Sequence, residues 1–517
     1  MTKNASPGNV LLITTDQHRA DTLGAYGNPV CQTPNLDRFA AQGTRFDAAR
    51  TTNPFCQPVR ATILTGQYPS SHGVTFNGID LPADAADRAV STELARAGAK
   101  TAFFGKAHFG STFPFYPTGH IESVAGSALM PEDWTGPYYG FEHVELVLFG
   151  HSLRTAPLMG DFTWCWGPPP MGLHYGRWLF RDGPKRGTER LRLMQPEAAG
   201  ESWGPTQTWR NQLPEEDHPT TWVTDRAIAW LEETTRADDN FFAWVSFPDP
   251  HHPMDPPSPW CDLYDPADVA QMLPEPHPEE FDTKPPLHKM WTLGNRGTPF
   301  EWANPGGATL SDRDLATMVA AYYGMVSQLD HNIGRILDRL DTLGLTGDTT
   351  VIITTDHGEM LGDHQMVFKG PVHYDELLRI PLLARGPGVD PGAVVTTPVG
   401  SVDLAPTLLE AAGVPAPEHY EGRSIFGDAQ CQHLCEDDFD AVVRVPLRTL
   451  TTEGHKLTRW LDAPGVGELY DLVEDPGEIT NRWSDPAYAA VRDDLLAELT
   501  TASRPVTRHL DKVGLVG

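Results

Sequence analysis

Two short apolar runs, far apart in the chain, constrain the fold more than any other feature of the sequence. Asn9–Thr15 (NVLLITT) and Thr349–Thr355 (TTVIITT) are rich in aliphatic and β-branched residues, and each is followed at once by an aspartate. Continuous apolar runs of this length are typical of strands buried on both faces of a parallel sheet. Because functional groups gather at the carboxyl ends of such strands, we expect Asp16 and Asp356 to lie at one edge of that sheet.

Helical patterns separate and follow these runs, which predicts an α/β fold. We expect a large central mixed, mostly parallel sheet flanked by helices. The predicted helices cover residues 35–42, 221–235, 315–343 and 404–412.

Near residue 425 the pattern changes to short strands followed by one helix. The expected strands are 441–451, 455–461 and 468–471, and the helix is 487–500. This pattern predicts a smaller C-terminal antiparallel sheet with one helix. We therefore expect a catalytic α/β domain over 1–425 and a small α+β domain over 426–517, joined in the loop 413–427.

The charge balance bears on possible partners. Lys and Arg number 39 against 69 Asp and Glu, a net charge of −30, which repels nucleic acid and anionic lipid at long range. No run of eighteen apolar residues occurs, so no membrane span is predicted. With no signal-peptide pattern and only 6 scattered cysteines, we expect a cytoplasmic protein with reduced thiols, and neither a nucleic-acid nor a membrane partner.

Each of the two aspartates is followed by a second potential ligand. Gln17 follows Asp16, and His357 follows Asp356. Either aspartate alone could simply cap a helix. The repetition after two apolar strands favours an oxygen-rich site for a hard divalent cation.

A second informative segment, NPFCQPVRATILTG, runs from residue 53 to residue 66. Pro58 suits the first turn of a helix and Gly66 its end, so Cys56 should lie at the helix N-terminus, where backbone amides favour negative charge. A cysteine there can act as a nucleophile, with Arg60 one turn away as a fixed cation. Taken alone, Cys56 also fits a buried structural thiol.

This segment resembles the signature of the formylglycine-dependent sulfatases of the alkaline phosphatase superfamily, C-x-P-S/A-R followed by a helix and T-G-x-x-P. The matching residues are Cys56, Pro58, Arg60, Thr65, Gly66 and Pro69. Further segments similar to family motifs follow in family order: GKAH at 105–108, PHHP at 250–253, TDHG at 355–358, FKG at 368–370 and ELYDL at 468–472.

The resemblance implies a cofactor and a metal. In that family a formylglycine-generating enzyme oxidises the cysteine to an aldehyde, and its hydrate offers one oxygen to attack sulfur and a second to expel sulfate later. The implied ligands of one divalent metal ion are Asp16, Gln17, Asp356, His357 and the modified Cys56. Calcium fits this oxygen-dominated set, and the imidazole also admits manganese.

The resemblance also implies roles for the remaining polar residues. Arg60 would orient the modified side chain and stabilise developing charge, and Lys106 and Lys369 would bind the sulfate oxygens. His108 would take the second proton of the diol. Either His251 or its neighbour His252 would protonate the leaving alcohol, because the doubled histidine leaves both alignments open.

Two departures from the family pattern bear on function. Residue 59 is Val where the motif usually has Ser and sometimes Ala, a side chain that the modifying enzyme reads. The Asp-Gln and Asp-His pairs resemble those of choline sulfatases and phosphonate monoester hydrolases more than the Asp-Asp and Asp-Asn pairs of many arylsulfatases.

Three hypotheses follow from the sequence. The leading one is hydrolysis of a small-molecule or carbohydrate sulfate ester. The second is a phosphonate monoester or phosphodiester hydrolase with the same nucleophile. The third is an inactive relative in which Cys56 stays a thiol. The sequence pattern carries no information on the oligomeric state.

Overall fold

The computed structural model describes residues 8–148, 171–195, 198, 205, 207–236, 239–291, 310–427, 430–440 and 444–514. Its largest element is an eight-stranded sheet in the order β5-β4-β6-β1-β7-β8-β2-β9. The strands are β5 (His143–Leu146), β4 (Lys100–Gly105), β6 (Phe241–Ser246), β1 (Asn9–Thr15), β7 (Thr349–Thr355), β8 (Leu382–Arg385), β2 (Thr44–Phe46) and β9 (Ala393–Val395). All neighbouring strands are parallel except β8, which is antiparallel to both β7 and β2. The predicted mixed, mostly parallel sheet is confirmed.

The two apolar runs form the neighbouring strands β1 and β7, with the predicted bounds. They pair in parallel from Asn9 opposite Thr349 to Thr15 opposite Thr355. Every residue of both strands is buried, as a continuous apolar run requires. Asp16 and Asp356 therefore leave the sheet side by side at the same edge.

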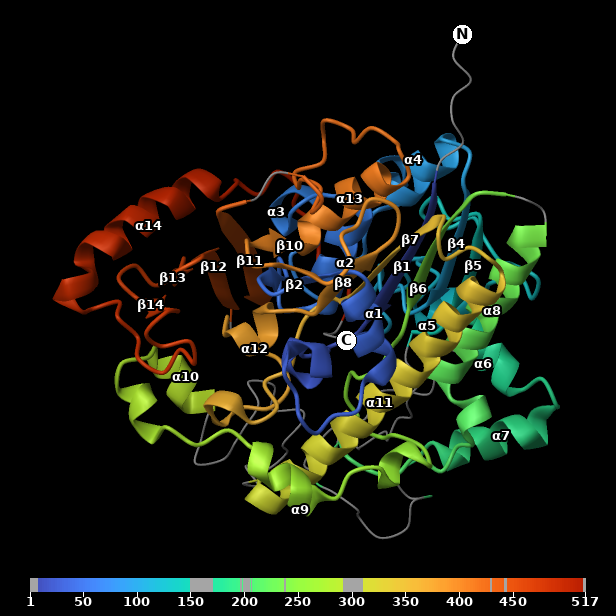
Figure 1. Cartoon of the computed structure of the whole chain (residues 1–517), viewed down its shortest axis with the longest axis horizontal. Coiled ribbons are helices and arrows are strands. Elements are labelled where there is room, and N and C mark those ends of the chain that lie inside the picture. The colour runs from blue at the N-terminus through green and yellow to red at the C-terminus, as the bar shows by residue number, and fades with distance from the viewer. Residues whose placement is uncertain are drawn as a thin grey trace.

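Helices cover both faces of this sheet (Figure 1). Residues of α1 (Pro34–Gln42), α8 (Pro219–Arg236) and α11 (Asp312–Thr342) pack on the face that carries Leu11 and Ile13. Residues of α2 (Cys56–Thr65), α4 (Val90–Arg96) and α13 (Leu404–Ala411) pack on the face that carries Val10 and Leu12. The four helices predicted from the sequence are α1, α8, α11 and α13, each placed to within one turn.

The described residues also form several short strands and helices outside the large sheet. They are β3 (Ala49–Arg50), β10 (Val399–Gly400), α3 (Pro69–His72), α5 (Val124–Ser127), α6 (His174–Leu179), α7 (Pro184–Leu193), α9 (Pro266–Val269), α10 (Pro286–Trp291) and α12 (Asp375–Leu378). None of the helices among the described residues is both long and apolar enough to cross a membrane.

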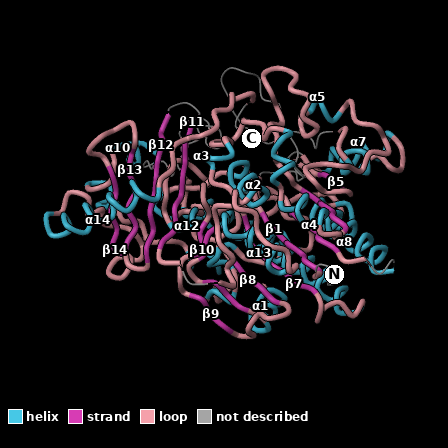
Figure 2. The backbone as a smooth tube through the Cα atoms, turned by 90° about the horizontal axis from the view of Figure 1, so that it is seen from above, coloured by secondary structure: helices cyan, strands magenta, loops and turns pink. Residues whose placement is uncertain are grey.

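A separate four-stranded antiparallel sheet lies beside the large one (Figure 2). Its strands are β11 (Gln432–Asp440), β12 (Arg444–Thr452), β13 (His455–Trp460) and β14 (Gly467–Asp471), and α14 (Ala489–Ala502) packs on it. Leucines of all four strands meet Leu495 and Leu499 of α14 in one apolar cluster. The predicted small antiparallel sheet with one helix is confirmed.

Strand β11 was not predicted from the sequence, and the expected strand 441–451 corresponds to β12 over its described residues. Residues 441–443 of that expected strand lie outside the described part of the chain. β11 carries Glu436, Asp437 and Asp438 in succession, a run that is typical of a solvated loop. In the structure Glu436 and Asp437 are buried, and the Arg448 guanidinium lies 2.9 Å from Asp438 and 4.0 Å from Glu436.

The small sheet contacts the segment that leads into α2. The Glu436 backbone N–H donates to the Thr52 carbonyl at 2.9 Å, and the Asn53 side-chain amide donates to the Glu436 carbonyl at 2.6 Å. The edge strand β11 is therefore hydrogen-bonded directly to the segment that leads to Cys56.

Candidate active site

Four adjacent strands deliver polar side chains to one edge of the large sheet. In sheet order these strands are β4, β6, β1 and β7. The chain that follows them supplies, respectively, Lys106 and His108, His251 and His252, Asp16 and Gln17, and Asp356 and His357. All eight side chains are buried, as are Cys56, Arg60 and Lys369. The structure thus brings every site residue predicted from the sequence into one region.

Cys56 is the first residue of α2, as its sequence context predicts. The preceding Phe55 is extended (φ −121°, ψ 147°), and Gly66 ends the helix in the left-handed conformation at φ 63°. A Cβ on Gly66 would also come within 2.7 Å of the Tyr420 ring, so glycine is required on two grounds. All ten residues of α2 are buried, so the Cys56 sulfur is held rigidly at a helix N-terminus.

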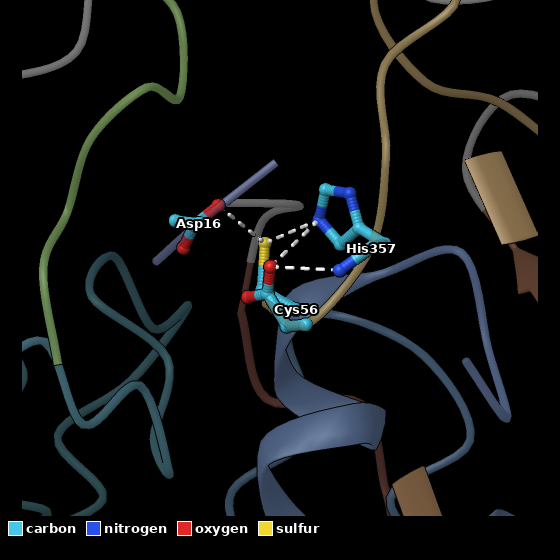
Figure 3. A group of neighbouring side chains, drawn as sticks. Asp16, Cys56 and His357 are labelled. Atoms are coloured by element: carbon cyan, nitrogen blue, oxygen red, sulfur yellow. Dashed lines mark hydrogen bonds and ion pairs between the residues drawn. The ribbon is translucent and has the colours of Figure 1, made fainter. Parts of the chain in front are cut away.

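The Cys56 sulfur lies among charged and ring nitrogen atoms. Lys369 Nζ is 2.9 Å from Sγ, His357 Nε2 is 3.2 Å away, and Asp16 Oδ1 is 3.8 Å away. Figure 3 shows the sulfur between the Asp16 carboxylate and the His357 ring. Burial and Asp16 raise the pKa of Cys56, but Lys106, Lys369 and His357 outweigh them, so its net pKa is lowered. Negative charge at this position is therefore favoured.

The Arg60 guanidinium links the two aspartates. Its Nε donates to Asp356 Oδ2 at 2.9 Å and its Nη2 donates to Asp16 Oδ2 at 3.0 Å. The remaining Nη1 donates to the Lys106 carbonyl at 2.5 Å and to Ser246 Oγ at 2.7 Å. Because one planar guanidinium reaches the ends of four strands, it fixes their relative positions as well as the two carboxylates.

The charges around Asp16 hold it ionised. Lys106 Nζ lies 2.5 Å from its Oδ2. Burial alone would raise the pKa of Asp16, but Lys106, His251, Arg60 and Lys369 together hold it well below its usual range. An aspartate kept ionised in a buried site is suited to bind a cation.

The residues present fit a divalent metal ion. One ligand atom each from Asp16, Cys56, Asp356 and His357 lies within 4.8 Å of the others, and all four residues are buried. Gln17 adds a further oxygen donor: its buried Oε1 has no hydrogen-bond partner among the described residues. Carboxylate and amide oxygens with one imidazole form a donor set for a hard or borderline cation.

The neighbouring histidines face different partners. His251 Nε2 lies 3.1 Å from Lys369 Nζ, inside the cluster around Cys56. His252 Nδ1 instead lies 3.1 Å from the Gln17 amide nitrogen. Burial, Lys369, His252 and Lys106 set the pKa of His251 well below its usual value, so it is neutral in this arrangement. The two rings therefore have different surroundings: His251 faces the cluster around Cys56, and His252 faces Gln17.

His108 lies on a left-handed turn after β4, at φ 52°. Its backbone N–H and that of Phe109 both donate to the Glu122 carboxylate, at 2.5 and 2.9 Å. Burial, Lys106 and Arg60 lower the pKa of His108 well below its usual value. A neutral imidazole beside this cation pair is able to accept a proton.

Glu359 is a further buried polar residue of this region, and it was not singled out from the sequence. It is fully buried, its side chain contacts Gln17, and it follows His357 by only two residues in the TDHGE segment. Burial raises its pKa above the usual value, against the opposing effect of hydrogen bonds from Leu361, Gln17 and Phe368. The signal available in the sequence was an additional acidic residue two positions after the candidate ligand pair Asp356 and His357.

Known proteins resemble this chain over most of its length. The model of the family described as Sulfatase matches residues 8–414, and the model described as N-sulphoglucosamine sulphohydrolase, C-terminal, matches residues 362–504. The multifunctional alkaline phosphatase superfamily protein PehA of Trinickia caryophylli is 29% identical, over 97% of each chain. The arylsulfatase of Clostridium perfringens is 28% identical, over 93% of this chain and 91% of its own.

A solved structure is similar over nearly the whole length. The phosphonate monoester hydrolase of Agrobacterium radiobacter aligns with a TM-score of 0.74 and 27% identity, covering 96% of this chain and 95% of its own. The family model, which spans far more than half of the sequence, and the buried cysteine, aspartate and histidine cluster lead to one conclusion. The chain belongs to the sulfatase family of sulfuric ester hydrolases, within the alkaline phosphatase superfamily.

Proposed function

We propose that the protein hydrolyses sulfate esters of a small molecule or carbohydrate, with residue 56 in its formylglycine form as the nucleophile. One observation carries this proposal: Cys56 lies at the N-terminus of α2, within 4.8 Å of ligand atoms of Asp16, Asp356 and His357. The products would be inorganic sulfate and an alcohol. The modification would be made by a formylglycine-generating enzyme.

The metal would be held by Asp16, Gln17, Asp356 and His357 together with residue 56. Calcium suits this oxygen-rich set, and manganese is the alternative. When bound, the ion supplies positive charge that lowers the pKa of the hydroxyls on residue 56 and screens the substrate anion.

The protein's own residues bind the anion and move the protons. Arg60, Lys106 and Lys369 bring three cations to the site beside Asp16 and Asp356, and this positive charge favours an anionic substrate. We assign the sulfate oxygens to Lys369, whose Nζ lies 2.9 Å from Cys56 Sγ, and to Lys106, which together with Lys369 lowers the pKa of Cys56.

Two histidines are assigned to the proton transfers. His251, 3.1 Å from Lys369 Nζ, is placed to protonate the departing alcohol. His108 is assigned to accept a proton from residue 56 when inorganic sulfate departs. Before substrate binds, the pKa of each imidazole lies well below normal, so both are neutral. His108 can therefore accept a proton, whereas His251 would first take up a proton, such as the one that the attacking hydroxyl of residue 56 releases, and then pass it to the alcohol.

A second candidate function is hydrolysis of phosphonate monoesters or phosphodiesters. It is favoured by the likeness to the Agrobacterium radiobacter hydrolase over 96% of this chain. Sulfate monoesters, phosphonate monoesters and phosphodiesters are all tetrahedral monoanions, so the charges of the site accommodate each of them. Which of these esters the site hydrolyses fastest therefore depends on the groups that surround the reacting centre.

The decisive experiment combines one preparation with two substrates. The protein is produced together with a formylglycine-generating enzyme, and mass spectrometry of the peptide containing residue 56 measures its conversion. Rates are then compared for 4-nitrophenyl sulfate and 4-nitrophenyl phenylphosphonate, which share a leaving group, with Cys56→Ala as the matched blank.

Each result of this comparison selects one function. A higher kcat/KM for the sulfate supports the leading proposal, and a higher value for the phosphonate selects the second. Converted protein that hydrolyses neither substrate, or that is no faster than Cys56→Ala, contradicts both. Protein that remains entirely in the thiol form under these conditions favours the inactive relative.

A further inference from the structure

We propose that Glu359 is a positioning residue that determines which atom of the Gln17 side-chain amide faces the metal. The inference rests on the metal site of the proposed function and goes beyond it, because Glu359 itself is not a ligand. It is carried by the hydrogen bonds of these two buried side chains.

The Glu359 carboxylate is fixed in place by its own loop. Its Oε1 accepts the backbone N–H of Leu361 at 3.1 Å and also that of Phe368. These two bonds hold together two parts of the loop between His357 and Lys369. Because Oε1 is held by backbone groups, the second oxygen, Oε2, has a defined position, and it contacts the Gln17 amide nitrogen.

In the structure the NH₂ end of the Gln17 amide faces Glu359, and because an amide nitrogen only donates, Glu359 Oε2 accepts one of its hydrogens. The same nitrogen lies 3.1 Å from His252 Nδ1. The two hydrogens of the amide are thereby directed to Glu359 and His252. The carbonyl oxygen Oε1 is left over, buried and without a hydrogen-bond partner among the described residues.

The leftover oxygen is the end of the amide that can bind a cation, since an amide NH₂ offers no comparable lone pair. The Gln17 backbone reinforces the placement. Its N–H donates to Asp356 Oδ1 at 3.0 Å, and its carbonyl accepts from the Tyr322 hydroxyl at 2.5 Å. The residue is thus held at both its main chain and its side chain, with only Oε1 unused.

A glutamine at position 359 would reverse this arrangement. Its carbonyl oxygen would still have to accept from Leu361 and Phe368, so its NH₂ would face Gln17. Two NH₂ groups cannot hydrogen-bond to each other, and the Gln17 amide would turn its oxygen toward residue 359. The metal would then face an NH₂ group. Exchanging the two residues restores a matched pair with the same total charge.

The experiment measures affinity for Ca²⁺ and Mn²⁺ by isothermal titration calorimetry, with all proteins carrying the same form of residue 56. Glu359→Gln should bind about 10- to 100-fold more weakly than wild type, the range expected for partners that orient metal ligands. The reciprocal double variant Gln17→Glu with Glu359→Gln should recover most of the loss. Thermal melting with a chelator checks that each variant folds.

Glu122→Gln is the matched control. Glu122 is also a buried glutamate that accepts two successive backbone N–H groups, those of His108 and Phe109, yet it contacts no proposed ligand. Its substitution should leave metal affinity unchanged. A loss of affinity in Glu122→Gln equal to that in Glu359→Gln would mean that any buried glutamate change disturbs the site, and would overturn the proposal.

The outcomes distinguish this inference from the proposed function. Glu359→Gln with wild-type affinity, or a double variant no better than Glu359→Gln alone, overturns the positioning role while leaving the metal site intact. If Glu359→Gln does not fold, the double variant decides by itself: near wild-type affinity supports the proposal and weak binding overturns it. A wild-type protein that binds neither ion removes the metal site and the inference together.

Discussion

Lys369 Nζ lies 2.9 Å from Cys56 Sγ, although 312 residues separate them in the chain. The same ammonium group is 3.1 Å from both His357 Nε2 and His251 Nε2. One buried cation therefore contacts the proposed nucleophile, a proposed metal ligand and the proposed acid. This relationship makes Lys369 the residue whose charge bears on most of the chemistry.

Replacing Lys369 with Met should abolish most of the turnover without unfolding the protein. The substitution keeps the length of the side chain and removes the charge that would bind the ester oxygens. The expected loss is about 10²- to 10³-fold in kcat, as for removal of one oxyanion donor. Steady-state kinetics with a 4-nitrophenyl ester measures it. Lys512→Met, on a half-buried lysine that bonds the Asp440 carbonyl, serves as the control and should keep the wild-type rate.

Removing the metal should stop the reaction, and so should Asp356→Asn. Asp356 accepts hydrogen bonds from Arg60, Gln17 and His357, and Asn keeps its size but loses the negative charge. We expect dialysis against a chelator to suppress activity and added Ca²⁺ or Mn²⁺ to restore it in wild type only. Full activity of metal-free wild type, checked by elemental analysis, would refute the metal assignment.

Local sequence pattern was enough to predict the framework of this site. The strands that precede Asp16 and Asp356 are continuous apolar runs, a pattern typical of strands that are buried on both faces. Their predicted bounds agree with the structure. Pro58 and Gly66 bracket α2 because proline fits a first helical turn and glycine the left-handed end. These features depend on residues close together in the chain.

The remaining features depend on partners that are far apart in the chain. Nothing near residue 369 indicates that its amine reaches Cys56, and the roles of His251 and His252 separate only when Gln17 is seen beside the second ring. β11 was missed because its three successive acidic residues oppose burial locally. Arg448, on the neighbouring strand, offsets part of that cost.

Val59→Ser should increase the fraction of formylglycine at residue 56 while lowering stability. Serine is the usual residue of the family motif at this position, where the modifying enzyme reads the side chain. Val59 is fully buried in the apolar cluster that packs on one face of the large sheet, so its loss should cost about 2–3 kcal/mol of unfolding free energy. Mass spectrometry and denaturant unfolding measure the two effects. Equal conversion in both proteins would contradict the first expectation.

The stability lost in His364→Gln should be larger at pH 6 than at pH 9. Burial and Lys284 lower the pKa of His364, but Glu280, at 2.7 Å, and Glu376 outweigh them and raise it above its usual value. Because the pKa of His364 is higher in the folded than in the unfolded protein, its protonation stabilises the fold. This contribution is fully present below the pKa of the unfolded state, about 6.5, and it disappears as the pH rises through the pKa of the folded state. Melting temperatures of both proteins at the two pH values test this.

His72→Gln is the control for this pH dependence. Burial lowers the pKa of His72 to about 3, so His72 is neutral in the fold and costs stability as pH falls below about 6.5. The difference from wild type should therefore change with pH in the opposite direction. Parallel behaviour of the two histidine variants would contradict the assigned charge states.

His251→Asn should slow esters of poor leaving groups far more than esters of good ones. An alkyl alcohol needs a proton as its bond to sulfur breaks, whereas 4-nitrophenolate departs as a stable anion. We expect a loss of about 10²- to 10⁴-fold for an alkyl sulfate and a much smaller loss for 4-nitrophenyl sulfate. His252→Asn should not show this dependence on the leaving group, because His252 Nδ1 is directed at the Gln17 amide. If His252→Asn shows it and His251→Asn does not, the acid is His252 and the two residues exchange roles.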